Sequence, residues 1–146
     1  MLESPLAKNL FLRTLAFAKT KHEFQIDNFV IMDNHFHLLL WPPPASGLPL
    51  LMKWILGVYT MKYNRIYGTC GHVWGERYFS RPIADSSEYR IISAYIDVNP
   101  VKACLVADPA EWEWSGFYHH LVGRRDIAEA PPWLATGVRP RVIMLP

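Results

Sequence analysis

The residues with the clearest chemical potential are His35 and His37, which are separated by one residue at the start of an apolar run that continues to Leu40. In an extended strand, residues i and i+2 project to the same face, so both imidazoles point to one side. Two adjacent imidazoles provide half of a metal site. The alternative interpretation is two ordinary polar residues on a solvent-facing side. A closed structural zinc site is disfavoured, because the chain has two cysteines and no CxxC pair.

The histidine pair follows a predicted hairpin turn. Residues 26–32 form another apolar segment typical of a strand, and Asp33 and Asn34 lie between the two segments. Both residues tolerate positive φ, which suits a two-residue turn. We therefore expect the imidazoles near the end of a hairpin, where a substrate can reach them.

A tyrosine and an asparagine share a helix face further along the chain. A capping-box sequence at residues 85–88 precedes a helix-length segment at residues 89–99, which Pro100 ends. Tyr95 and Asn99 are four residues apart, so they lie one turn from each other on one face. A phenol beside an amide oxygen is a nucleophile beside a ligand for a hard metal. The alternative interpretation is that Tyr95 belongs to the core of an amphipathic helix.

Several stretches of the sequence resemble a known family in their order and spacing: NHFHLLL, GHVWGERYFSRPIADSSEY, AYIDVNPVKACLV and DPAEWEWSGF. The family is that of the REP-associated tyrosine transposases, of the single-tyrosine HUH class, and the resemblance covers roughly residues 8–120. It implies a nuclease and strand transferase whose partner is single-stranded DNA with a palindromic hairpin. It also implies that His35 and His37 are paired metal ligands, that Asn99 is a third, polar ligand and that Tyr95 is the nucleophile.

These residue types suit the transfer of a phosphodiester. A divalent cation on the phosphate oxygens acts as a Lewis acid and neutralises negative charge in the transition state. Two imidazoles and an amide oxygen admit Mg²⁺ or Mn²⁺, and the imidazoles favour Mn²⁺. A phenol is more acidic than an alcohol, and its attack would produce a 5′-phosphotyrosyl bond and a free 3′-hydroxyl. Strand transfer from that intermediate needs no ATP.

Tyr78 is the alternative nucleophile, because it lies closer in sequence to the histidines than Tyr95 does. It belongs to a predicted short strand at residues 77–83, which Pro82 confines to a sheet edge or a strand end. Arg77 and Arg81 lie on the opposite face of this strand from Tyr78. We assign packing or DNA contact to Tyr78, and catalysis to Tyr95.

The overall charge says little about a partner, because a net charge of +2 is too small to establish nucleic-acid binding. Cations and aromatic residues alternate, however, on a helix predicted at about residues 50–67 and in the segment that follows it. Such a pattern can combine phosphate contacts with base stacking, and the alternative is a solvated helix face with aromatic packing. The candidate DNA-binding residues are Lys53, Lys62, Arg65, Trp74, Arg77 and Arg81.

The length of 146 residues fits one domain, which we place at residues 1–130, followed by an extended C-terminal tail at residues 131–146. The chain opens without a signal-sequence pattern and has no apolar run of about 18 residues. We therefore expect no membrane association and a cytoplasmic location. Cys70 and Cys104 are expected to be reduced there.

The N-terminal segment departs from the family pattern. Ser4 and Pro5 are typical of a helix start, and the helix is expected to reach about Lys21. Related chains begin with a β-strand that lies mid-sheet, beside the histidine strand. We therefore predict that the exposed edge of the histidine strand pairs with residues 77–83 or with the tail near residues 142–145, or that it drives self-association.

The predicted fold class is α+β: a ferredoxin-like antiparallel sheet with helices on one face, lacking or replacing its first strand. The predicted function is a metal-dependent single-strand DNA transposase or nuclease, working as a monomer or a homodimer. Two alternatives come from other classes. One is a DNA-hairpin binding protein that keeps the fold without catalysis, and the other is an RNA-binding ferredoxin-like module whose sheet aromatics stack bases.

Overall fold

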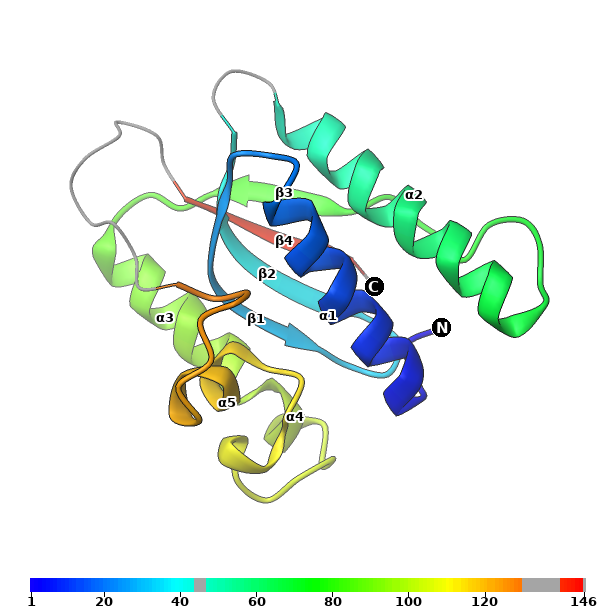
Figure 1. Cartoon of the computed structure of the whole chain (residues 1–146). Coiled ribbons are helices and arrows are strands. Elements are labelled where there is room, and N and C mark those ends of the chain that lie inside the picture. Colours follow the sequence, from blue (N-terminus) through cyan, green and yellow to red (C-terminus); the bar gives the residue numbers. More distant parts are fainter. Residues whose placement is uncertain (44–46, 130–139, 146) are drawn as a thin grey trace.

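The computed structural model of the chain describes residues 1–43, 47–129 and 140–145. Three strands are interspersed with helices along the first two thirds of the chain, and a last strand follows near its end (Figure 1). The elements are α1 (Pro5–Lys19), β1 (Gln25–Ile31), β2 (Phe36–Trp41), α2 (Gly47–Tyr67), β3 (Phe79–Pro82), α3 (Ser86–Asp97), α4 (Asn99–Lys102), the 3₁₀ helix η1 (Pro109–Glu111), α5 (Gly116–Leu121) and β4 (Arg141–Leu145).

The four strands form one antiparallel sheet in the order β1-β2-β4-β3. The histidine strand β2 is therefore paired on both edges: His37 lies opposite Val30 of β1 and opposite Met144 of β4. The α+β class and the antiparallel sheet are confirmed. The prediction that the exposed edge of β2 pairs with the tail near residues 142–145 is also confirmed, and β4 stands where the resemblance places the first strand.

The end of the chain thus contributes a strand for which its sequence gives little signal. Residues 131–139 and 146 of the expected tail lie outside the described residues. The other segment proposed as a partner, residues 77–83, supplies β3, which pairs with β4 and not with β2. Alternation explains how β4 fits between its neighbours, because Ile143 and Leu145 join the core on one face and Val142 joins the core on the other.

Helices cover both faces of the sheet, which corrects the expectation of helices on one face. α1 and α2 pack together on one face, over Phe36, Leu38 and Leu40 (Figure 1). α3 packs on the opposite face, where Leu39 and Val30 meet its apolar side. The reason is that β1 and β2 are buried along nearly their whole length, so both of their faces need a cover.

The N-termini of α1 and α3 begin at the capping residues that the sequence indicated. Ser4 Oγ accepts a hydrogen bond from the Ala7 amide at the start of α1, with Pro5 in its first turn. Asp85 Oδ1 accepts from the amides of Ser87 and Glu88 at the start of α3. None of the described helices is long and apolar enough to cross a membrane.

Truncation of Ile143 tests whether β4 is an integral part of the fold. Ile143 is fully buried in the middle of the sheet, so Ile143→Ala should lower the free energy of unfolding by about 2–4 kcal/mol. Met144→Ala, on the same strand but only partly buried, should cost clearly less. Urea unfolding of the two variants measures the difference, and equal small losses would show that β4 is not packed as described.

Candidate active site on the α3 face of the sheet

Two imidazoles and one amide converge on the face of the sheet that α3 covers. His35 Nε2 lies 3.4 Å from Asn99 Oδ1, and Asn99 Nδ2 lies 3.3 Å from His37 Nε2. The two imidazole rings are 5.0 Å apart between centroids. The structure therefore brings Asn99 to two histidines that lie more than 60 residues before it in the sequence.

Tyr95 completes this group from the last turn of α3. Its ring meets the ring of His37 edge-on, with the centroids 5.7 Å apart, and 44% of the residue is exposed. The buried side chains of α3 are instead Tyr89, Ile92 and Ile96. The alternative interpretation of Tyr95 as a core residue is therefore wrong, and its phenol is accessible from solvent beside the imidazoles.

The break between α3 and α4 determines where the side-chain amide of Asn99 lies. α3 ends at Asp97, and α4 begins at Asn99 with Pro100 in its first turn, because a proline lacks the N–H that a continued α3 would need. Asn99 is only 6% exposed, and its carbonyl accepts from the amide of Ala103. Its side chain is thereby directed at the two histidines.

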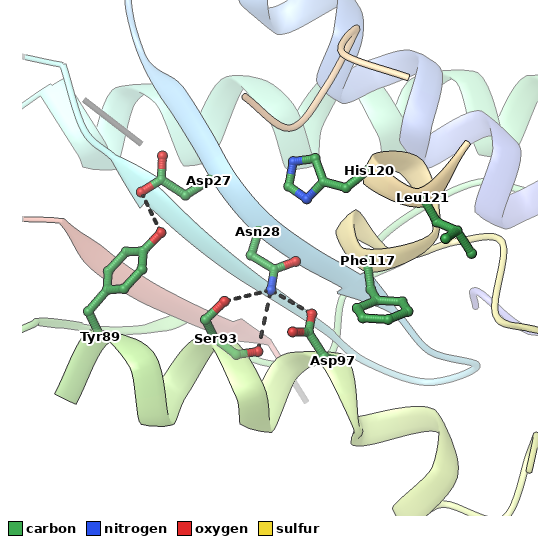
Figure 2. A pocket seen from close by; sticks show the side chains of 8 residues that line it. All are labelled: Asp27, Asn28, Tyr89, Ser93, Asp97, Phe117, His120 and Leu121. Carbon is green, nitrogen blue, oxygen red and sulfur yellow. Dashed lines mark hydrogen bonds between the residues drawn. The ribbon is translucent and has the colours of Figure 1, made fainter. Parts of the chain in front are cut away.

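The opposite flank of α3 is fastened to β1. Asn28 Nδ2 donates to Ser93 Oγ at 2.9 Å and to Asp97 Oδ1 at 2.7 Å, as Figure 2 shows. These residues line a pocket of about 420 Å³. Nearby, Tyr89 donates to the buried Asp27, whose pKa burial raises to about 6. Because most of these polar groups bind one another, we interpret the pocket as the seam that fixes α3 on the sheet.

The turn that carries His35 is held by a buried lysine of α1. Lys8 is 2% exposed, and its ammonium lies 2.6 Å from Asp33 Oδ1 and donates to the carbonyl of Glu3. The Asp33 carbonyl accepts from the amide of Leu2. Neither Asp33 nor Asn34 has a positive φ, which corrects the turn type that the sequence suggested. The contacts to α1 hold the turn in its observed form.

The tautomer of His35 follows from its neighbours. His35 Nδ1 lies 2.8 Å from Asn34 Oδ1, which can only accept a hydrogen bond, so a neutral imidazole carries its proton on Nδ1. Its Nε2 then directs a lone pair at Asn99 Oδ1, which is also electron-rich. A divalent cation held by both atoms would remove the repulsion between them.

His37 is held in the neutral form that metal binding requires. Burial, with a smaller contribution from neighbouring His35, lowers the pKa of His37 to about 4. Its Nδ1 is buried and has no hydrogen-bond partner among the described residues, so nothing there stabilises an imidazolium. At neutral pH the ring therefore offers a lone pair.

The geometry fits a small divalent cation. Two ligand atoms that each lie about 2.1 Å from one ion are separated by roughly 3 Å, close to the 3.4 Å between His35 Nε2 and Asn99 Oδ1. His37 Nε2 instead faces the amide nitrogen of Asn99, so its lone pair would have to exchange that hydrogen bond for the ion. Residues 1–43, 47–129 and 140–145 contain no group of three His, Cys, Asp or Glu side chains that could hold a metal. A metal at this site would thus rely on an amide as its third protein ligand, as the sequence suggested for Asn99.

Most of the predicted DNA-binding residues do not lie with this group. Lys53, Lys62 and Arg65 belong to α2, which covers the opposite face of the sheet. Arg77 is exposed just before β3. Arg81 forms an ion pair with Glu88 of α3. The local sequence pattern grouped these cations correctly along the chain but could not assign them to a face.

Trp74 and Tyr78 pack against the core that α1 and α2 share. Trp74 donates to the Leu56 carbonyl, and its ring meets those of Phe11 and Phe36. This engagement leaves the indole poorly placed to stack on a DNA base. The position of Tyr78 in that core agrees with the packing role assigned to it.

Lys102 also lies at this site, although the sequence alone did not indicate a role for it. Its ammonium lies 4.6 Å from the centroid of the Tyr95 ring. The only available signal was the spacing of seven residues, about two helical turns, within the stretch AYIDVNPVKACLV. Met144, which pairs with His37 across the sheet, gave no signal, because its position depends on a strand pairing more than 100 residues apart.

Comparisons with known proteins give the family of the chain and a solved structure of the same fold. Residues 2–99 match the sequence model of a family described as "Transposase IS200 like". The chain is 28% identical over 110 residues to the REP-associated tyrosine transposase of Escherichia coli (strain K12), covering 73% of this chain and 63% of that protein. A solved structure of a REP-associated tyrosine transposase bound to a REP hairpin shares the fold, with a TM-score of 0.67 and 20% identity, over 89% of this chain and 77% of the other.

The depressed pKa of His37 predicts how stability depends on pH. Below the unfolded-state pKa of 6.5, His37 binds a proton in the unfolded chain, whereas in the folded chain it stays neutral down to about pH 4. The contribution of neutral His37 to the free energy of unfolding is therefore complete above pH 6.5 and is lost as the pH falls from 6.5 to 4. The free energy of unfolding, measured with urea in EDTA, should therefore fall less between pH 7 and pH 5 in His37→Leu than in the parent. An identical fall in both proteins would contradict a buried, neutral His37.

Proposed function

The chain belongs to the family of IS200-like transposases, and from this membership we propose that it is a metal-dependent endonuclease and strand transferase of the HUH type, acting on hairpin-bearing single-stranded DNA. The observation that carries the proposal is the exposed phenol of Tyr95 beside the imidazole of His37, with Asn99 within reach of both histidines. A binding module would not need a nucleophile at this position.

The proposed reaction joins Tyr95 to the 5′ side of the cleaved strand. The phenolic oxygen attacks phosphorus, the new oxygen–phosphorus bond forms, and the bond from phosphorus to the 3′-oxygen breaks. The phenol loses one proton and the departing 3′-oxygen gains one, so protons balance over the step. The 5′-phosphotyrosyl bond keeps the energy of the phosphodiester, and attack by a 3′-hydroxyl reverses the step.

His35, His37 and Asn99 are proposed to hold a divalent cation, Mg²⁺ or Mn²⁺, through imidazole nitrogens and an amide oxygen. When bound, such an ion supplies Lewis-acid activation of the phosphate. The neighbouring residues orient these ligands. Asn34 fixes the tautomer of His35, and Lys8 fixes the turn on which both stand.

A DNA hairpin is the proposed partner. The similar solved structure is of a protein bound to a REP hairpin, and its fold covers 89% of this chain. The exposed cations of α2, Lys53 and Arg65, would contact phosphates only of a DNA that extends around the molecule, because α2 lies on the opposite face of the sheet from Tyr95. DNA contacts nearest the reaction must therefore come from α3, α4 and the strands beneath them.

Removal of one oxygen tests the nucleophile. Tyr95→Phe should abolish formation of a covalent protein–DNA adduct with a single-stranded hairpin oligonucleotide, while leaving binding nearly unchanged, because the ring and its contact with His37 remain. Tyr78→Phe is the matched control and should form adduct at a rate within a few-fold of the parent. Denaturing gels measure the adduct, and fluorescence anisotropy measures binding.

The same assay separates the alternatives. Adduct formation that persists in Tyr95→Phe and disappears in Tyr78→Phe would reverse the assignment. Hairpin DNA that binds the parent tightly without any adduct would point to a binding protein without catalysis. Preference for an RNA hairpin under equal conditions would favour an RNA-binding module.

Metal removal tests the ligand set. EDTA should stop cleavage by the parent, and His35→Ala or His37→Ala should reduce it by orders of magnitude, since each removes one nitrogen ligand. Asn99→Ala should reduce it less, because water can replace an amide oxygen. Binding of Mn²⁺, followed by electron paramagnetic resonance, should weaken in the same order. Full cleavage in EDTA would show that the histidines have another role.

A further inference from the structure

The ring of Tyr95 has a cationic neighbour as well as an imidazole. Lys102, the last residue of α4, places its ammonium 4.6 Å from the centroid of the Tyr95 ring, while His37 meets the same ring edge-on. Lys102 is exposed and forms no ion pair with any acid in the described part of the chain. Its three N–H donors therefore remain available for a ligand.

Other cations on this side of the sheet are less well placed. Arg81 is occupied by Glu88. Arg90 is exposed on α3 but lies five residues before Tyr95, and a spacing of five places two side chains on different sides of a helix. Among the described residues, Lys102 is the cation that the structure places against Tyr95.

We propose that Lys102 is a further catalytic residue, whose ammonium binds the phosphate that Tyr95 attacks. This inference rests on the proposed function. An ammonium above the ring face lies beside the hydroxyl and not in line with it, so it leaves the path of attack open. The non-bridging oxygens of a phosphate at the hydroxyl would come within its reach, and the contact is a charge-assisted hydrogen bond.

Lys102 takes part in no covalent step. The oxygen–phosphorus bond to Tyr95 forms and the bond to the 3′-oxygen breaks as described above, with the ammonium protonated throughout. Its contribution is electrostatic, because negative charge on the phosphate oxygens is stabilised by a donor that is already in place. The same contact serves the 5′-phosphotyrosyl intermediate, which carries its phosphate on the ring that Lys102 covers.

Charge removal at Lys102, compared with charge removal elsewhere, tests the proposal. Lys102→Met keeps the length of the side chain and removes its charge, whereas Lys102→Arg keeps the charge and the contact with the ring. Lys21→Met is the matched control, because Lys21 is also exposed and places its ammonium 5.5 Å from the ring centroid of Phe17, away from the site. Single-turnover adduct formation and binding of the same hairpin oligonucleotide are measured for each variant.

Lys102→Met should slow single-turnover adduct formation by about 10²-fold. It should change the dissociation constant of the DNA by less than about three-fold, since one exposed phosphate contact contributes little to a large interface. Lys102→Arg should retain most of the rate, and Lys21→Met should resemble the parent in both measurements. Retained activity in Lys102→Arg also shows that position 102 tolerates substitution without loss of the fold.

Three results would overturn the role of Lys102 alone: a rate for Lys102→Met equal to that of Lys21→Met, a loss of binding as large as the loss of rate, or a rate for Lys102→Arg as low as that for Lys102→Met. Each presupposes that the parent forms the adduct. A parent protein that forms no adduct would instead overturn the proposed function, and this inference with it.

Discussion

The antiparallel pairing of β2 with β4 is the interaction on which the rest of the structure depends. Without β4, the strand that carries His37 would present an unpaired row of N–H and C=O groups beside an apolar surface. With β4 in place, β2 is paired on both edges and separates the two hydrophobic clusters on the opposite faces of the sheet. Phe36 and Leu38 support α1 and α2 on one face, and Leu39 supports α3 on the other. This packing on both faces fixes the position of the His37 imidazole.

Each remaining member of the site is fixed by a different part of the chain. The turn that carries His35 is held from α1 through Lys8 and Asp33, while α3 is held from β1 through the amide of Asn28. The ring centroids of Trp112 and Trp114 lie 5.4 Å and 4.9 Å from the Lys8 ammonium, so the segment before α5 also contributes to this anchor. Contacts between packed elements, together with the anchored turn that carries His35, therefore set the distances between the candidate ligands and the candidate nucleophile.

What the sequence could predict was local. The i, i+2 spacing placed His35 and His37 on one side, the N-cap at Asp85 marked the start of α3, and the spacing of four set Tyr95 and Asn99 on one flank. What it could not predict depended on distant contacts. Trp74 packs against the core because its ring meets those of Phe11 in α1 and Phe36 in β2. The cations of α2 lie away from the site because α2 and α3 cover opposite faces of the sheet.

Because a chain is synthesised from its N-terminus, β2 is made well before its partner β4. Phe36 lies opposite Leu145, so the central ladder closes across 109 residues and must await the synthesis of β4. Contacts of such long range form slowly, because a large loop has to be closed before they contribute any stabilisation. A nascent chain therefore already contains both histidines and Tyr95 while the strand beneath them lacks one neighbour. The candidate site is therefore assembled in two stages: its side chains are all present once α4 has been made, and the sheet that positions His37 is completed only when β4 joins it.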